Sequence, residues 1–232
     1  MKILVTGATR GIGREAALAF LEKGCEVIGV YAHSEREADN LRKSGIALYK
    51  CDVSDKTEVT RLAESVGNID VLVNNAGISL RGLFQRVTED EEKALYGVNL
   101  FGTLNVTRAF LQGMINNKRG VIINVSSVFG ETGGSMEADY SASKAALIGL
   151  TKALAKEVGP SCIRVNCVTP GVIDTDMNAA LTIDEVRELT EEIPLESLGS
   201  PRSVADMITF LASDEASYIT GAVIRIDGGW KT

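Results

Sequence analysis

Short runs of apolar, mostly β-branched residues alternate with longer segments of helical periodicity along the whole chain. The runs are apolar at consecutive positions, as in Val71-Leu72-Val73 and Val121-Ile122-Ile123. Strands of this kind are buried on both faces, which is typical of a parallel sheet covered by helices. The regular alternation of strand and helix therefore predicts an α/β fold, a doubly wound parallel sheet of about seven strands flanked by helices.

The patterns place these elements along the sequence. We expect strands at 2–6, 26–31, 46–50, 70–74, 120–126, 162–168 and 222–226, and helices at 11–23, 35–43, 55–66, 89–117, 139–158 and 201–212. No linker-like or repetitive tract interrupts them, so a single domain is expected to span residues 1–232. The interval 171–199 is too long for a simple connection, contains Pro194 and carries an acidic helical stretch at about 184–192. We expect it to form a lid over the substrate site.

Composition narrows the classes of function. The chain has 24 Lys and Arg against 31 Asp and Glu, a net charge of −7 without a basic block, so nucleic acid is not expected as a partner. No stretch approaches the roughly 20 apolar residues of a membrane span, and no signal peptide is visible, so a cytoplasmic protein is expected. The four cysteines form no CxxC pair and lie far from the single histidine, which predicts buried free thiols and no metal site.

A glycine-rich turn joins the first strand to the first helix, in the sequence Thr6-Gly7-Ala8-Thr9-Arg10-Gly11-Ile12-Gly13. Glycines allow a tight turn and bring backbone N–H groups close to a pyrophosphate, and the helix N-terminus adds a partial positive charge. The spacing differs from the usual dinucleotide fingerprint, but its place after the first strand indicates a Rossmann-type nucleotide site. The cofactor-binding residues expected in this turn are Gly7, Thr9, Arg10, Gly11, Ile12 and Gly13.

The end of the second strand indicates which nicotinamide cofactor is bound. A carboxylate there would bind the ribose 2′-hydroxyl of NAD and repel a 2′-phosphate, but Tyr31 occupies about that position. Arg10 could pair with the phosphate and His33 could add a donor, although His33 could equally be an exposed loop residue. We therefore expect NADP(H), with Glu35 as the one nearby carboxylate that would oppose it.

Tyr140 and Lys144 open an expected helix in the sequence Tyr140-Ser141-Ala142-Ser143-Lys144. Residues four apart lie on one helix face, so the two side chains point the same way. A phenol has an unperturbed pKa of about 10, and a nearby ammonium stabilises the phenolate, so Lys144 is expected to lower the pKa of Tyr140. Taken alone, such a pair is more often an ordinary surface pair.

Polar residues also follow two neighbouring strands. Ser127 comes after the strand that ends near Asn124, and Asn74-Asn75-Ala76-Gly77 closes the strand before it. Doubly wound folds carry out their chemistry at the carboxyl ends of the strands, where Ser127 could donate a hydrogen bond to a substrate oxygen. Asn99 lies inside the expected 89–117 helix, where asparagine is unfavourable, which indicates a functional reason for it.

Together these motifs resemble the short-chain dehydrogenase/reductase family over essentially the whole chain. The resemblance rests on TGATRGIG at 6–13, NNAG at 74–77, VNLFG around Asn99, Ser127, YSASK at 140–144, PGVIDT at 170–175 and the terminal Asp227-Gly228-Gly229. Ser127 and Tyr140 are thirteen positions apart, the usual family spacing. The resemblance implies an NADP(H)-dependent oxidoreductase. Such an enzyme transfers a hydride between nicotinamide C4 and a carbonyl carbon while a phenol protonates the alkoxide.

The resemblance also implies a role for each site residue. Tyr140 is expected to be the general acid, Lys144 to lower its pKa and bind the nicotinamide ribose, and Ser127 to orient the carbonyl. Asn99 is expected to hold a water chain that supplies protons through Lys144. The remaining cofactor contacts that it implies are Asp52, Val53, Asn75, Ala76, Gly77, Pro170, Gly171, Ile173 and Thr175.

Among the branches of the family, the chain is most similar to bacterial 3-oxoacyl-[acyl-carrier-protein] reductases. This similarity implies a β-ketoacyl thioester substrate, which acyl carrier protein could carry, and a homotetramer. Helices 89–117 and 139–158 are more apolar than one sheet face needs, which also indicates assembly. Because carrier proteins are acidic, basic residues are expected near the cleft; Lys118 and Arg119 are candidates, but the second position expected in that branch is Ser161.

Two alternatives stay open. Glu137 and Asp139 would disfavour an anionic partner and suit a cationic substrate, although helix capping by Asp139 and a solvated Glu137 would also explain them. This loop and the run 159–177 are similar to the reductase that acts on the 5-aminopentanone modification of elongation factor P. A non-catalytic NADP-binding regulator is the alternative from another class, but it would not need the complete set of Asn99, Ser127, Tyr140 and Lys144.

Overall fold

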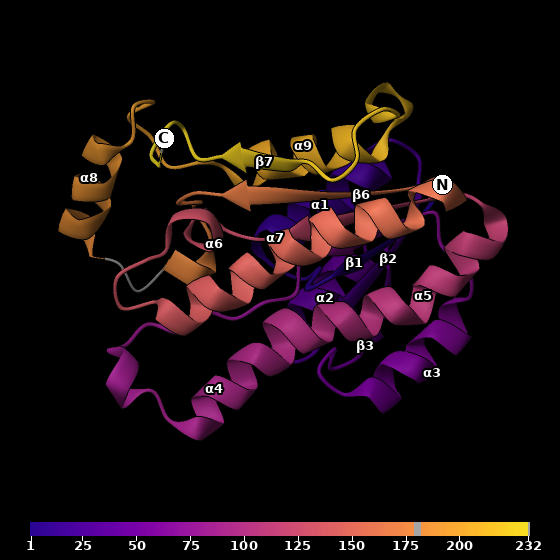
Figure 1. The fold of residues 1–232 in the computed structure, drawn as a ribbon, viewed down its shortest axis with the longest axis horizontal. Helices are drawn as coiled ribbons and strands as arrows, with labels where there is room; N and C mark the ends of the chain where they lie inside the picture. The colour runs from indigo at the N-terminus through magenta and orange to yellow at the C-terminus, as the bar shows by residue number, and fades with distance from the viewer. Residues whose placement is uncertain (179–181, 232) are drawn as a thin grey trace.

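A seven-stranded parallel sheet forms the centre of the computed structural model, which describes residues 1–178 and 182–231 (Figure 1). Its order is β3-β2-β1-β4-β5-β6-β7. The strands are β1 (Lys2–Thr6), β2 (Glu26–Tyr31), β3 (Ala47–Lys50), β4 (Val71–Asn74), β5 (Gly120–Val125), β6 (Ile163–Pro170) and β7 (Val223–Ile226). The expected doubly wound sheet is confirmed, and the strand order changes direction between β1 and β4.

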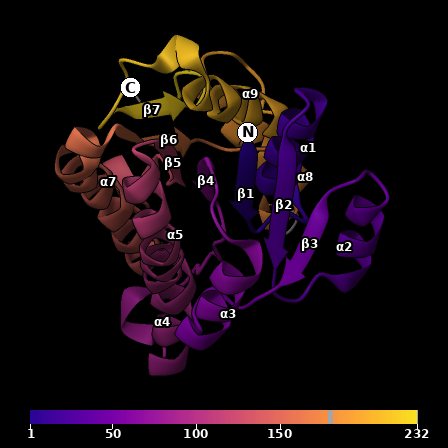
Figure 2. The same cartoon turned by 90° about the vertical axis from the view of Figure 1, so that its right-hand side faces the viewer.

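Helices cover both faces of the sheet (Figure 2). They are α1 (Gly11–Glu22), α2 (Glu35–Arg42), α3 (Lys56–Val66), α4 (Glu89–Tyr96), α5 (Thr103–Asn117), α6 (Phe129–Thr132), α7 (Ala138–Val158), α8 (Ile183–Glu192) and α9 (Pro201–Ala212). Within the described residues, no helix is long and apolar enough to span a bilayer.

Two apolar layers explain why the strands are apolar at consecutive positions. Ile3 and Val5 of β1 pack into the layer under α1 and α9, whereas Leu4 packs into the layer under α3, α5 and α7. All three side chains are fully buried. Successive strand residues point to opposite faces, so a sheet covered on both sides needs an apolar residue at every position.

The expected helix over 89–117 is continuous, but it is not α-helical throughout. A π-helical turn, Gly97–Gly102, separates α4 from α5. A Cβ on Gly102 would lie only 2.6 Å from Val53 Cγ2, so the turn brings the backbone against the loop after β3. π-Turns inside helices occur frequently at functional sites, and this one contains Asn99.

The cysteines are free thiols, but one expectation about them fails. Cys25, Cys51 and Cys167 are buried as predicted, whereas Cys162 is exposed. Cys162 has φ +57 at the end of a short 3-10 helix just before β6. It therefore belongs to the turn and not to the buried strand that the sequence suggested.

Candidate functional site

A cleft of about 470 Å³ opens where the carboxyl ends of β1 to β4 meet, at the change in strand order. Doubly wound sheets bind nucleotides at this kind of position. The cleft brings together most of the predicted cofactor residues: Gly7, Thr9, Arg10, Gly11, Ile12, His33, Asp52, Val53, Asn75, Ala76, Gly77 and Thr175. Other residues that the sequence did not assign to the cofactor also line it, among them Cys51 and Val98.

The glycine-rich turn forms a cradle that side chains would fill. Gly7 and Gly11 have φ +65 and +49, which favours glycine at both positions. Gly13 lies beneath the cleft: a Cβ there would lie 2.2 Å from the Gly7 carbonyl oxygen and 2.4 Å from Asn75 Nδ2. The turn also leads directly into the N-terminus of α1. Bare backbone at a helix N-terminus fits the pyrophosphate of a dinucleotide.

The rim of the cleft near β2 fits a 2′-phosphate better than the sequence suggested. Arg10 is exposed and lines the cleft. The opposing carboxylate, Glu35, accepts a hydrogen bond from the Tyr31 hydroxyl at 2.8 Å. It also lies 3.4 Å from the Arg42 guanidinium and 3.9 Å from the Lys50 ammonium. Arg42, which also pairs with Asp39, and Lys50 therefore offset part of the charge of Glu35.

Tyr140 and Lys144 lie on the first turns of α7, buried beneath the edge of the cleft. The Lys144 ammonium is 5.8 Å from the centroid of the Tyr140 ring. It donates a hydrogen bond to the Val125 carbonyl at 3.0 Å, which holds it at the carboxyl end of β5. Ser127, two residues further along, is also buried and faces the Tyr140 hydroxyl. The predicted phenol, ammonium and hydroxyl are thus brought together.

The expected lowering of the Tyr140 pKa does not occur in this geometry. Burial raises the pKa of Tyr140 to about 12; a hydrogen bond with Ser127 lowers it by less, and the charge of Glu137 raises it. Burial lowers the pKa of Lys144 to about 8. Both shifts have the same cause, because desolvation disfavours the charged form of each group. Tyr140 is therefore a protonated phenol at neutral pH, the form that an acid requires.

Asn99 holds the loop after β4 against α7. Its side-chain Nδ2 donates hydrogen bonds to the Ile78 carbonyl at 3.0 Å and to Ser143 Oγ at 3.1 Å. A Cβ on Gly77 would lie 3.3 Å from both Asn99 Oδ1 and Lys144 Nζ. Asn99 and Lys144 therefore border the same glycine at the inner end of the cleft.

The remaining predicted cofactor residues lie where β6 ends. Pro170 is the last residue of β6, and the Gly171 N–H donates to the Ile226 carbonyl at 2.9 Å. Ile173 is buried and forms a β-bridge with Gly199, which closes the base of the interval 171–199. Thr175 reaches the glycine-rich turn, since a Cβ on Gly11 would lie 3.1 Å from Thr175 Cγ2. Residues 179–181 of the expected lid fall outside the described residues.

Two expectations about charge near the substrate are wrong. Lys118 and Arg119 precede β5, so they lie at the opposite edge of the sheet from the site, and Arg119 is 4.0 Å from Asp70. Asp139 is buried and accepts a hydrogen bond from the Tyr96 hydroxyl at 3.2 Å, so it faces α4.

Glu137 lies close enough to Tyr140 for its charge to raise the pKa of that phenol. It is half-buried at the N-terminal end of α7, and burial raises its pKa while the charge of Arg81 opposes this. Arg81 was missed in the sequence. It lies four residues after the NNAG motif and 4.0 Å from Glu185 of α8.

Comparisons with known proteins identify relatives that are similar over nearly the whole chain. Residues 7–231 match the family described as enoyl-(acyl carrier protein) reductase. The chain is 43% identical over 236 residues to the 3-oxoacyl-[acyl-carrier-protein] reductase of Thermotoga maritima, covering 97% of this chain and 96% of that protein. It is 40% identical over 232 residues to the acetoacetyl-CoA reductase of Shinella zoogloeoides, covering 97% and 96%.

Solved structures are similar over the same length. The 3-oxoacyl-[acyl-carrier protein] reductase of Brucella melitensis is similar with a TM-score of 0.93 and 38% identity, covering 100% of this chain and 91% of that one. The aldohexose dehydrogenase of Thermoplasma acidophilum is similar with a TM-score of 0.90 and 33% identity, covering 99% and 93%. Relatives with the same fold therefore carry names with different substrates.

Proposed function

Because this chain belongs to the short-chain dehydrogenase/reductase family, we propose that it is an NADPH-dependent ketoreductase that reduces the 3-oxo group of an acyl thioester, most simply one carried on acyl carrier protein. The single observation that supports the chemistry is the buried group of Tyr140, Lys144 and Ser127 beside the cleft. The names of relatives at about 40% identity support the substrate.

The proposed mechanism assigns one task to each side chain. NADPH, when bound, supplies the hydride that the carbonyl carbon receives. Ser127 donates a hydrogen bond to the carbonyl oxygen, and Tyr140 transfers its phenolic proton to that oxygen as charge develops there. Lys144 stabilises the phenolate that remains, which the ammonium can do because it lies near the ring in a dry site.

The cleft residues would hold the cofactor in this proposal. Backbone N–H groups at Gly11 and Ile12 would bind the pyrophosphate, and Arg10 would pair with the 2′-phosphate. Asp52 and Val53 would contact the adenine. Residues around Ile173 and Thr175 would contact the nicotinamide carboxamide, and Lys144 the adjoining ribose. The interval 171–199 would close over the substrate.

A second candidate substrate is a ketone that carries an ammonium group on a protein, as in the 5-aminopentanone modification of elongation factor P. The half-buried Glu137 supports it, because a carboxylate close to Tyr140 attracts a cation and repels an acidic carrier.

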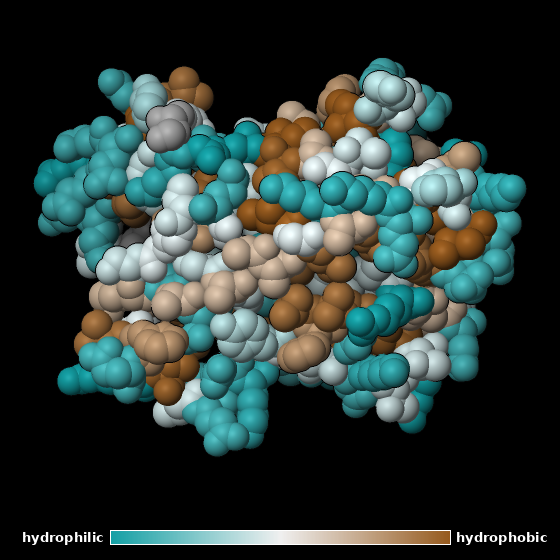
Figure 3. Space-filling view, viewed as in Figure 1, coloured by the Kyte–Doolittle hydropathy of each residue, from teal (hydrophilic) through white to brown (hydrophobic). Residues whose placement is uncertain are grey.

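We propose that the protein works in the cytoplasm as a homotetramer. Less polar side chains gather along the face formed by α5 and α7 (Figure 3), and Phe101 between α4 and α5 is 55% exposed. Apolar surface of this kind suits contact between copies of the chain. Sedimentation at micromolar concentration tests the assembly, and a monomer would contradict it.

A substrate panel tests the function. Wild-type protein with NADPH is expected to reduce acetoacetyl thioesters faster than aliphatic diketones or amino-ketones, followed as loss of NADPH absorbance. A preference for amino-ketones would favour the second candidate. No turnover with any ketone would leave cofactor binding alone and favour a non-catalytic regulator.

A further inference from the structure

The C-terminal tail, Asp227–Lys231, contacts both the proposed lid and the segment that follows Ser127. The Trp230 ring packs against Phe129, with ring centroids 5.7 Å apart and an interplanar angle of 59°. On its other side the Trp230 indole N–H donates a hydrogen bond to Glu192 Oε2 at 2.9 Å, at the last residue of α8. One side chain thus connects two segments that lie far apart in the sequence.

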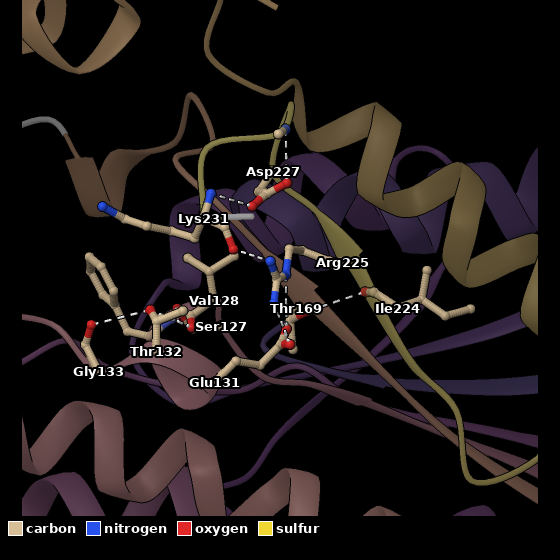
Figure 4. Close-up of polar contacts among 12 residues, drawn as sticks. Ser127, Val128, Glu131, Thr132, Gly133, Thr169, Ile224, Arg225, Asp227 and Lys231 are labelled. Atoms are coloured by element: carbon tan, nitrogen blue, oxygen red, sulfur yellow. Dashed lines mark hydrogen bonds and ion pairs between the residues drawn. The ribbon is translucent and has the colours of Figure 1, made fainter. Parts of the chain in front are cut away.

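The tail has a defined shape because its own side chains and Arg225 hold it (Figure 4). The Asp227 carboxylate accepts hydrogen bonds from the backbone N–H of Gly229 at 3.0 Å and of Lys231 at 2.9 Å. Arg225 of β7 donates to the Lys231 carbonyl and, at 2.8 Å, to the Glu131 carboxylate of α6. The tail is therefore fastened to the same short helix that begins two residues after Ser127.

The end of α8 packs on bare backbone of the tail. Gly228 and Gly229 have φ +65 and +87, and a Cβ on Gly228 would lie 2.7 Å from Ile193 Cγ2. The Leu195 N–H donates to the Gly228 carbonyl at 3.3 Å. Ile193 is buried in this contact. A shift of α8 must therefore move the tail or break these contacts.

Phe129 also contacts the loop that leads to Tyr140. A Cβ on Gly134 would lie 3.0 Å from the Phe129 ring, so this ring packs directly on the loop that precedes α7. The contacts run without interruption from Glu192 through Trp230 and Phe129 to Gly134. Phe129 is also bonded to Ser127, because its backbone N–H donates a hydrogen bond to Ser127 Oγ at 3.2 Å.

We infer that Trp230 is a positioning residue that couples the proposed lid to the Ser127 segment. When α8 is seated on the tail, Trp230 holds Phe129, and Phe129 holds the backbone next to Ser127. The inference rests on the proposed function, because it gives Trp230 a part in seating the carbonyl substrate. It predicts that the coupling acts on substrate binding and leaves the cofactor cleft unchanged.

Kinetics of conservative variants test the inference. Trp230→Phe keeps an aromatic ring on Phe129 but removes the indole N–H, and Glu192→Gln weakens its acceptor. Each is expected to raise the ketone KM by about 3–10-fold, with kcat and the NADPH KM within about twofold of wild type. The double variant should be no worse than either single one. Glu191→Gln, the neighbouring carboxylate on α8, is the matched control and should change nothing.

Unchanged ketone KM in both variants, or additive effects in the double variant, would overturn the inference. Hydrogen–deuterium exchange gives a readout that does not require turnover. Glu192→Gln is expected to speed exchange in residues 128–134 as well as in α8, and to have no added effect in the Trp230→Phe background. Faster exchange confined to α8 would refute the coupling. If wild-type protein reduces no ketone, the proposed function fails, and exchange still decides whether the two segments are coupled.

Discussion

The Asn99 side chain exchanges two hydrogen bonds with the backbone of Ile78. The Ile78 N–H donates to Asn99 Oδ1 at 2.8 Å, and Asn99 Nδ2 donates to the Ile78 carbonyl at 3.0 Å. Asn99 is fully buried, whereas Ile78 is exposed, so a buried amide holds the backbone of a surface loop. These two hydrogen bonds join the π-helical turn to the loop that follows the NNAG motif.

Asn99→Ala is therefore expected to lower the free energy of unfolding by about 1–3 kcal/mol, because it removes the three hydrogen bonds that this buried side chain makes with Ile78 and Ser143. Turnover should also fall, because the loop beside Lys144 loses its attachment. Urea unfolding followed by circular dichroism measures the stability. Asn116→Ala, an exposed asparagine on α5, is the control and should stay within about 0.5 kcal/mol of wild type. Equal effects of the two substitutions would contradict the structural role.

Tyr140→Phe should lower kcat by about 10²–10⁴-fold while the affinity for NADPH stays close to wild type. The phenol acts on the carbonyl oxygen and its loss leaves the ring packing intact. Stopped-flow reduction and NADPH fluorescence titration measure the two effects separately. Tyr218→Phe, at a fully exposed tyrosine, is the control. If the Tyr140 variant retained half of the activity, another group would have to be the acid.

Arg10→Ala should reduce the preference for NADPH over NADH by about 10–100-fold, since it removes a charge-assisted hydrogen bond to the 2′-phosphate. The ratio of kcat/KM for the two cofactors is the measurement. Arg14→Ala is the matched control, because Arg14 lies one turn further along α1 and pairs with Glu15. If the wild-type enzyme preferred NADH, the residues around Tyr31 at the end of β2 would not select the 2′-phosphate of NADPH.

The pH dependence of reduction should follow Lys144. Burial lowers its pKa from the ordinary 10.5 to about 8, so the ammonium is present at neutral pH and is lost as the pH rises through about 8. We expect kcat/KM to be level at about pH 6–7 and to fall above about pH 8 at saturating NADPH. Tyr140 does not cause this fall, because its pKa of about 12 lies well above the range. A level profile to about pH 9.5 would contradict the role of the ammonium.

The lowered pKa of Lys144 also predicts how the free energy of unfolding depends on pH. Between about pH 8 and 10.5 the unfolded chain binds the Lys144 proton and the folded chain does not. The free energy of unfolding contributed by this group therefore rises with pH in that window. Lys144→Met should remove this part of the pH dependence. Urea unfolding of the two proteins at matched pH values measures the difference, and parallel curves across the window would refute the buried charge.

Much of the fold was predictable because its signals are local. A strand that is apolar at every position has few alternatives to a sheet covered on both faces, and β1, β2 and β5 lie where that pattern occurs. The π-helical turn inside the 89–117 helix was not predictable in the same way. It depends on Gly102 meeting Val53 and on Asn99 meeting Ile78, contacts that only the folded chain creates.

The candidate site shows the same difference between local motifs and long-range contacts. The glycine-rich turn, Ser127 and the Tyr140–Lys144 pair are short motifs, so their positions followed from the sequence. Arg119 could not lie near the cleft, because residues before a parallel strand lie at the edge of the sheet opposite to residues after it. The direction of Asp139 depends on Tyr96, 43 positions away, and the contact of Trp230 with Glu192 spans 38 positions. Neither contact has a signal in the local sequence.

Glu137→Gln separates the two candidate substrates. Glu137 is half-buried and close to Tyr140, where its charge would pair with an ammonium group of the substrate and repel an acidic carrier. If the substrate carries an amine, the substitution should lower kcat/KM for amino-ketones by about 5–150-fold and spare neutral ketones of the same length. If the substrate is an acyl-carrier-protein thioester, its rate should stay the same or rise. Glu188→Gln, an exposed carboxylate on α8, makes the same change of charge and is the control. Equal losses on amine and neutral substrates would mean that Glu137 only supports the start of α7, and the amine-bearing ketone would then lose its main support.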